Sequence, residues 1–89
     1  MGLQETLKAL NDETRREILH LLRRGPMTAG DIAGHFSMSA ATVSHHLSVL
    51  KNAGLVWDDR HGKFIDYGLN TSVFEELMLW LSEFKEERR

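Results

Sequence analysis

Apolar residues recur along this chain with two spacings, and each spacing predicts a different kind of element. Spacings of three and four residues, typical of amphipathic helices, occur in five stretches, roughly residues 2–10, 13–24, 29–36, 40–53 and 72–86. Residues 55–59 and 64–69 alternate instead, as the strands of a β-hairpin do. We therefore expect a mainly α-helical fold with a small β-hairpin, in the order α-α-α-α-β-β-α, as a single domain over residues 1–89.

The stretch from residue 28 to residue 54 has the spacing of a helix-turn-helix. Thr28 is placed to cap the first helix, and Asp31 follows three residues later, as in a capping box. After a short turn at residues 37–39, Ser39 is placed to cap the second helix, and Gly54 is placed to stop it. We expect two helices joined by a tight turn.

The second helix of this pair has an apolar side and a small polar side, because each residue turns about 100° around the helix axis. Val43, Leu47 and Leu50 share one stripe and should pack inward. The candidate DNA-reading residues on the other side and its flanks are Ala41, Thr42, Ser44, His45 and Ser48. Short side chains let a helix approach base edges in a major groove. An ordinary solvated helix face gives the same pattern.

Two neighbouring histidines on this helix should differ in environment. His45 lies on the outward side, where it could contact a base edge or a phosphate. His46 lies about 60° from the core stripe, so we expect it to be partly buried, hydrogen-bonded and neutral.

The helix before the helix-turn-helix also shows a start, an apolar face and a stop. Asp12 is a predicted N-cap, and Gly25-Pro26 is expected to end the helix. Arg15 and Arg16 are expected to point outward, either as part of a solvated face or, for one of them, in contact with a phosphate.

The predicted hairpin directly follows the helix-turn-helix, as a wing does. Its turn at residues 60–63 places the basic side chains of Arg60, His61 and Lys63 around a glycine that can adopt a positive φ. We expect these three side chains to contact flanking phosphates or the minor groove. An ordinary solvated turn is the alternative.

The last helix has a wide apolar stripe for a terminal helix. The candidate dimer-interface residues are Leu3 and Leu7 of the first helix and Val73, Leu77, Trp80, Leu81 and Phe84 of the last. A second subunit would bury this stripe, although it could instead cover the domain's own core. A two-fold dimer would present two recognition helices and therefore predicts an inverted-repeat site in double-stranded DNA.

The net charge of −2 argues weakly against a nucleic-acid partner, but its distribution weakens that objection. Residues 71–89 carry three basic and five acidic side chains, so residues 1–70 sum to zero. The chain has no cysteine, no apolar run long enough to span a membrane and no secretory signal pattern. We therefore expect no membrane insertion and a cytoplasmic location.

Several runs of residues together resemble the ArsR/SmtB family of winged-helix repressors. These runs are Asp12–Arg16, Thr28–Ala33, Thr42–Leu47, Ala53–Val56 and Gly62-Lys63 with Tyr67 and Leu69. The details are most similar to the small SdpR-like autorepressors. The resemblance covers nearly the whole chain and implies a homodimeric repressor that a protein or small-molecule inducer releases from its operator.

The metal sites of the family's founding members do not carry over to this sequence. Their cysteine site near residues 28–33 has no counterpart, because the chain has no cysteine, and residues 71–89 contain no histidine for the other site. Asp31 and His35, spaced i and i+4, could in principle chelate, but a first-turn acid and an exposed histidine explain them equally well. We expect no metal and no cofactor.

The sequence does not suggest an enzyme. Ser44 and His45 are neighbours on one predicted helix, without an orienting carboxylate or an oxyanion hole nearby in sequence. The alternative to a DNA-binding repressor is a winged-helix protein-interaction module that does not bind DNA sequence-specifically.

Overall fold

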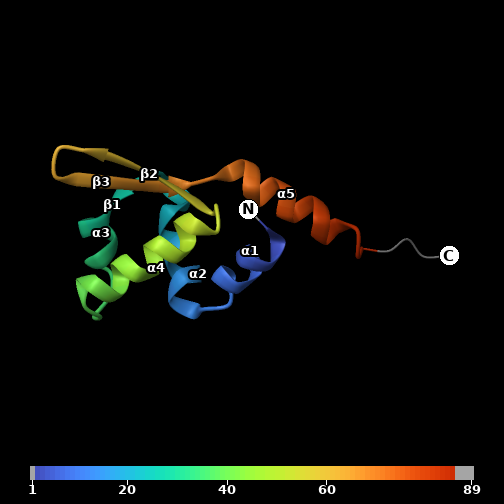
Figure 1. The fold of residues 1–89 in the computed structure, drawn as a ribbon, viewed down its shortest axis with the longest axis horizontal. Coiled ribbons are helices and arrows are strands. Elements are labelled where there is room, and N and C mark those ends of the chain that lie inside the picture. Colours follow the sequence, from blue (N-terminus) through green and yellow to red (C-terminus); the bar gives the residue numbers. More distant parts are fainter. Residues whose placement is uncertain (1, 86–89) are drawn as a thin grey trace.

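The computed structural model describes residues 2–85 (Figure 1). Its elements are α1 (Leu3–Leu10), α2 (Glu13–Leu21), η1 (Leu22–Arg24), β1 (Met27–Thr28), α3 (Ala29–Ala33), α4 (Ala40–Asn52), β2 (Val56–His61), β3 (Phe64–Leu69) and α5 (Thr71–Ser82). The five predicted helices and the predicted hairpin are all present, so the expected mainly helical fold with a winged helix-turn-helix is confirmed.

Three helices are shorter than their apolar patterns predict. The second predicted helix tightens into the 3-10 turn η1 before Gly25, whose φ of 137° ends it. α3 ends at Ala33, and the residues after it continue only through short-range turn bonds such as Phe36 N–H to the Ala33 carbonyl. α5 likewise gives way after Ser82 to turn bonds of the same kind. Glu86, the predicted end of this helix, lies outside the described residues.

A third strand was not predicted from the sequence. Strand β1 pairs antiparallel with β3, through Met27 opposite Tyr67 and Thr28 opposite Asp66, and gives the sheet the order β1-β3-β2. A strand of two residues is too short to show alternation. Thr28 also caps α3, because its Oγ1 accepts the backbone N–H of Asp31 at 3.1 Å. This cap therefore joins the sheet to the helix-turn-helix.

The hairpin turn is tighter than predicted. His61 pairs with Phe64, so the turn consists of Gly62 and Lys63 alone, and Arg60 lies within strand β2. Gly62 has a φ of 62°, and no residue other than glycine has a positive φ in the described chain. Glycine at the first of two turn positions is typical of a type II′ turn, which matches the twist of a hairpin.

The core lies where α2, α3, α4 and the sheet meet. Its fully buried large side chains are Ile18, Leu22, Ile32, Val43, Leu47, Leu50 and Leu55. The predicted inward stripe of α4 is therefore confirmed. Thr6 is a buried polar side chain, and its hydroxyl donates to the carbonyl of Ala53 at 3.4 Å, which ties α1 to the end of α4.

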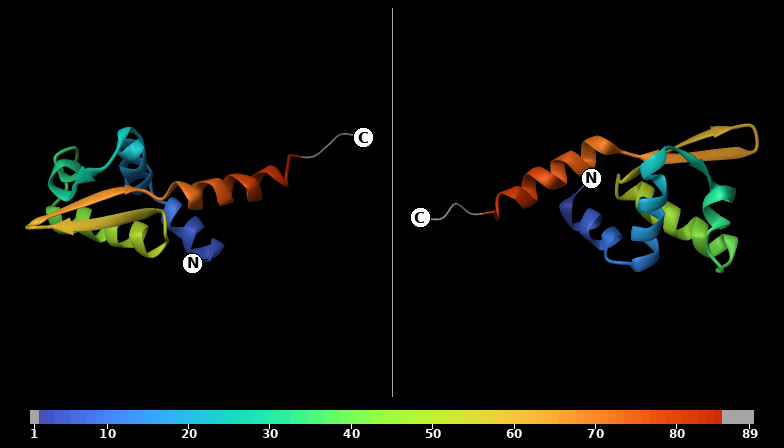
Figure 2. Two further views of the ribbon diagram at one scale, coloured as in Figure 1. Left: turned by 90° about the horizontal axis from the view of Figure 1, so that it is seen from above. Right: turned by 180° about the vertical axis from the view of Figure 1, so that it is seen from behind.

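The wing and α5 extend from opposite ends of this core (Figure 2). The molecule is accordingly elongated, with extents of 55 × 25 × 23 Å. The wing forms one projection, next to the helix-turn-helix, and α5 forms the other, directed away from it.

Candidate nucleic-acid interface

Helix α4 begins at a well-defined cap. The hydroxyl of Ser39 accepts the backbone N–H of Thr42 at 3.1 Å, which satisfies one of the free donors of the first turn. The side-chain hydroxyls of Ser39 and Thr42 are also hydrogen-bonded, at 2.9 Å. The hydroxyl of Thr42 is therefore engaged locally, and its methyl group is the part of the side chain best placed for an apolar contact.

The structure brings the predicted reading residues together on one exposed face. Ala41, Thr42, Ser44, His45 and Ser48 are all exposed, whereas Val43, Leu47 and Leu50 are buried on the opposite side of α4. Lys51 follows this face and forms an ion pair with Asp58 of β2, with Nζ to Oδ2 at 3.0 Å. This ion pair joins the end of α4 to strand β2 and offsets the charge of Lys51.

The basic residues of the wing do not form a single cluster. Arg60 lies opposite Ile65, whereas His61 lies opposite Phe64 on the next pair of the ladder. Because successive side chains of a strand point to opposite faces, the register places Arg60 and His61 on opposite faces of the wing. All three predicted contact residues, Arg60, His61 and Lys63, are exposed.

An acidic partner of the wing histidine was missed in the sequence. His61 Nε2 lies 2.7 Å from Oδ2 of Asp66, and this hydrogen bond, with the charge of the carboxylate, raises the pKa of His61 above its usual value. A two-residue turn places residues 61 and 66 as diagonal neighbours on one face. The exact turn length was the information needed to find the pair.

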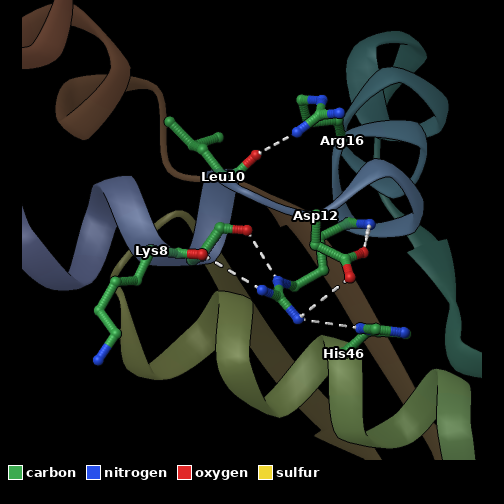
Figure 3. Close-up of polar contacts among 7 residues, drawn as sticks. Lys8, Leu10, Asp12, Arg16 and His46 are labelled. Atoms are coloured by element: carbon green, nitrogen blue, oxygen red, sulfur yellow. Dashed lines mark hydrogen bonds and ion pairs between the residues drawn. The ribbon is translucent and has the colours of Figure 1, made fainter.

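Arg15 does not point outward, and that prediction is wrong, because its guanidinium contacts Lys8, Asp12 and His46, which are labelled in Figure 3. Its Nε donates to the carbonyl of Ala9 at 2.7 Å and its Nη2 to the carbonyl of Lys8 at 3.2 Å, so its side chain is only 14% exposed. The last carbonyls of a helix lack intrahelical donors, and a nearby guanidinium can supply them. Arg16 is exposed, but its Nη1 donates to the carbonyl of Leu10 at 2.7 Å.

The Arg15 side chain also connects α2 to α4. Its Nη1 lies 3.2 Å from Nδ1 of His46 and 3.9 Å from Oδ2 of Asp12. The other carboxylate oxygen of Asp12 accepts the backbone N–H of Arg15 at 3.0 Å, and this bond lowers the pKa of Asp12. His46 is partly buried and hydrogen-bonded, as predicted.

The predicted dimer stripe divides into two parts. Val73 is buried in the core of its own chain, and Leu77 and Trp80 line a groove of about 200 Å³ against Gly2, Leu3 and Thr6 of the N-terminal segment. Farther along, Leu81 of α5 is 53% exposed, and Phe84, just after the helix ends at Ser82, is 69% exposed. Val73 therefore packs into the core of its own chain, Leu77 and Trp80 line a groove beside the N-terminal segment, and the far part of the stripe is exposed.

The described residues offer neither a metal site nor a membrane span. Within residues 2–85, no three His, Asp or Glu side chains gather closely enough to hold a metal ion. No helix in the same range is long and apolar enough to cross a membrane.

The sequence comparisons find bacterial regulatory proteins. The family described as "Bacterial regulatory protein, arsR family" matches residues 12–57, from the cap of α2 into β2. The transcriptional repressor SdpR of Bacillus subtilis is 49% identical over 82 residues, which cover 92% of this chain and 91% of that protein. The transcriptional regulator NmtR of Mycobacterium tuberculosis is 42% identical over 82% of this chain and 61% of its own length.

Solved structures with the same arrangement come from the same kind of protein. The crystal structure of an ArsR family transcriptional regulator superimposes with a TM-score of 0.89 at 29% identity, covering 93% of this chain and 91% of that one. A homodimeric winged helix-turn-helix DNA-binding domain from Mycobacterium bovis has a TM-score of 0.74 at 28% identity, covering 98% of this chain and 84% of its own.

Proposed function

Because this chain belongs to the ArsR family of bacterial regulatory proteins, whose members are DNA-binding transcriptional regulators rather than enzymes, we propose that it is a homodimeric repressor of an inverted-repeat operator. Each protomer places α4 in a major groove and its wing on the flanking backbone or minor groove. Its compartment in this proposal is the cytoplasm, and a protein or small-molecule inducer releases it from DNA.

The observation that carries this proposal is the exposed face of α4. Ala41, Thr42, Ser44, His45 and Ser48 are short or planar and together present hydroxyls, methyl groups and an imidazole without an acidic side chain. Such a face can approach base edges closely and meets no repulsion from phosphates. The cap at Ser39 fixes the start of the helix, so these side chains project from a rigid backbone.

The wing supplies contacts of a different kind. Lys63 lies at the tip, and Arg60 and His61 project from opposite faces just behind it. Three cationic or protonatable groups distributed in this way suit the phosphates on either side of a groove. Replacing Lys63 with alanine should weaken binding to all duplexes about equally and reduce the salt dependence of binding. An unchanged salt dependence would remove Lys63 from the contact surface.

The homodimer is supported by the exposed far end of α5 and by the homodimeric relative from Mycobacterium bovis. In a two-fold dimer the residues of this surface meet their own copies. The proposed interface uses Leu81 of α5 and Phe84, which follows α5, together with Leu3 and Leu7 of α1, and each of these is exposed in the single chain.

Selection from a pool of random duplexes at physiological salt tests the proposal directly. We expect enrichment of an inverted repeat whose half-sites lie about one helical turn apart. Failure of a folded dimer to enrich any sequence would refute the proposal and favour a protein-interaction module.

Variants of α4 then test which residues read the operator. Thr42→Ala and His45→Ala should each weaken binding to the selected operator by about 1–3 kcal/mol, with the fold unchanged. His20→Ala is the matched control, because His20 is an exposed histidine on α2, away from the α4 face. Unaltered operator binding in both α4 variants would remove these residues from the reading face.

A further inference from the structure

Arg15 makes contacts that extend from α1 to α4. We propose that Arg15 is a positioning residue for DNA reading, which holds α4 in the orientation that the operator requires through its hydrogen bond to His46. The inference deepens the proposed function and depends on α4 being the DNA-reading helix.

The guanidinium of Arg15 is fixed from several sides before it reaches α4 (Figure 3). The carbonyls of Lys8 and Ala9 hold Nη2 and Nε, at 3.2 and 2.7 Å, and the carboxylate of Asp12 lies 3.9 Å from Nη1. These groups lie at the end of α1 and the start of α2. The remaining contact of Nη1, to His46 at 3.2 Å, therefore joins a rigid support to the middle of α4.

The polarity of this hydrogen bond determines the proton state of His46. A guanidinium can only donate, so Nδ1 of His46 must accept with its lone pair. A neutral imidazole with its proton on Nε2 meets that requirement. A doubly protonated imidazolium does not, because it would place an N–H and a positive charge against the guanidinium.

His46 is well placed to transmit a loss of its hydrogen bond with Arg15 to the reading face. It lies between His45, a candidate reading residue, and Leu47, which is buried in the core. Recognition of base edges needs side chains held to within a fraction of an ångström. A small rotation of α4 about its buried stripe would move every reading residue together.

The charged groups around His46 come from several elements. From α2 and its cap, Arg15 and Asp12 face the imidazole, and on α4 itself the ring of His45 lies 6.0 Å away between centroids. From α1, Glu5 and Lys8 line the adjoining groove beside Arg15 and His45.

The two other elements that pack on α4 contribute no such group. On β2, Asp58 is paired with Lys51 at the far end of α4. Asp31 of α3 and His35, which follows α3, are exposed, and within residues 2–85 neither forms a hydrogen bond with His46. Asp12 is therefore the carboxylate that lies beside the hydrogen bond between Arg15 and His46, with Oδ2 3.9 Å from Nη1 of Arg15.

The expected effect distinguishes a positioning residue from a phosphate contact. Loss of a phosphate contact weakens binding to any duplex about equally. Loss of the hydrogen bond between Arg15 and His46 would instead loosen α4 and reduce the preference for the operator. The informative quantity is therefore the ratio of operator affinity to affinity for an unrelated duplex of equal length.

The experiment measures this ratio at constant pH and ionic strength. His46→Leu, which cannot accept a hydrogen bond, should lower the ratio about tenfold. His46→Asn should keep a higher ratio, because its side-chain oxygen can accept from Arg15. Equal ratios for the two variants would overturn the role of His46.

A matched pair of variants tests Arg15. Arg15→Met and Arg16→Met each remove a guanidinium that binds a carbonyl at the end of α1, but of the two only Arg15 contacts α4. We expect Arg15→Met to have a low ratio and Arg16→Met to behave as the unmodified chain. Equal behaviour of the two variants would overturn the positioning role.

Nuclear magnetic resonance of the imidazole nitrogens gives a readout that does not require DNA. At pH 8 we expect Nδ1 of His46 without a proton and Nε2 with one, a state that Arg15→Met should no longer favour. A proton on Nδ1 in the unmodified chain would contradict the inference even if operator binding is found. Absence of any operator preference, with Nδ1 found as expected, would instead refute the proposed function and with it the role in DNA reading.

Discussion

The helix-turn-helix body and the far end of α5 have similar apolar patterns but opposite exposures. In the body, Leu47 of α4 is 1% exposed, and its neighbours on the same stripe are equally buried. Leu81 of α5 and Phe84 just after it are 53% and 69% exposed, although they continue the same stripe as the buried Val73. The comparison shows that helical periodicity identifies an apolar face but does not identify what covers it.

The difference follows from how much of the chain packs around each of the two helices. Helices α2 and α3 and the sheet surround α4, so its apolar stripe is closed by the chain itself. Helix α5 leaves the body at its first turn and extends away from it (Figure 2). Large exposed apolar side chains in a row are costly in water, and a second copy is the occupant that the proposed function supplies.

The first prediction compares the same truncation in the two regions. Leu47→Ala should lower the free energy of unfolding by about 2–5 kcal/mol, because it leaves a cavity in a closed core. Leu81→Ala should change the unfolding of the isolated protomer by less than about 0.5 kcal/mol. Chemical denaturation at a concentration low enough to keep the chain monomeric measures both. Equal losses would mean that Leu81 is as buried in the protomer as Leu47.

The second prediction concerns the proposed interface. Leu81→Glu should raise the dimer dissociation constant about 100-fold, because it places a charge in an apolar contact, while the circular dichroism of the helices stays unchanged. Sedimentation equilibrium measures the constant, and Ser82→Glu, which adds the same charge beside it, is the control. A dimer of unchanged affinity would place the interface on another surface.

The third prediction tests the close contact between Gly68 and Trp57 within the wing. Gly68 lies opposite Trp57 in the ladder, and a side chain at residue 68 would collide with the indole ring. Gly68→Ala should therefore displace Trp57 and destabilise the protein by about 1–3 kcal/mol. Denaturation followed by tryptophan fluorescence reports both effects. A variant of full stability with an unchanged spectrum would show that the ring has room to move.

The smallest effect is expected at the hydrogen bond between His61 and Asp66. The folded state raises the pKa of His61, so this contact stabilises the wing fully below about pH 6.5 and loses its effect as the pH rises through the higher folded pKa. Asp66→Asn should therefore speed amide exchange in the wing at pH 5.5 more than at pH 8.5. A difference that is the same at both pH values would contradict this assignment.

The features that sequence predicted well are those set by local chemistry. Caps at Asp12, Thr28 and Ser39 depend on a side chain and a backbone group three residues away, and all three are present. The buried stripe of α4 follows in the same way from helix periodicity.

The features that sequence missed depend on contacts between distant elements. Strand β1 has two residues and exists because β3 lies beside it. Arg15 was expected in solvent because it follows the polar pattern of α2, yet carbonyls of α1 and the imidazole of His46 surround it. Neither the contact with the α1 carbonyls nor the contact with His46 can be inferred from the residues of α2 alone.

The candidate DNA-contacting residues could be predicted in part from local chemistry and in part only from the structure. Those on α4 could be selected by helical rotation, and the structure leaves them exposed together as expected. The wing residues are exposed, as predicted. Their division between two faces depends on the length of the turn, and the alternation of apolar residues does not fix that length to within one residue.

The distance between the two recognition helices of a dimer tests the central claim most directly. The chain has no cysteine, so Asn52→Cys places one spin label at the exposed end of α4 of each protomer, outside the candidate reading residues. Pulsed electron paramagnetic resonance should give a distribution centred near about 34 Å, one turn of DNA, that narrows when the selected operator is added. No dipolar coupling between labels, or a centre far from one DNA turn in the presence of operator, would contradict a dimer that reads two half-sites with α4.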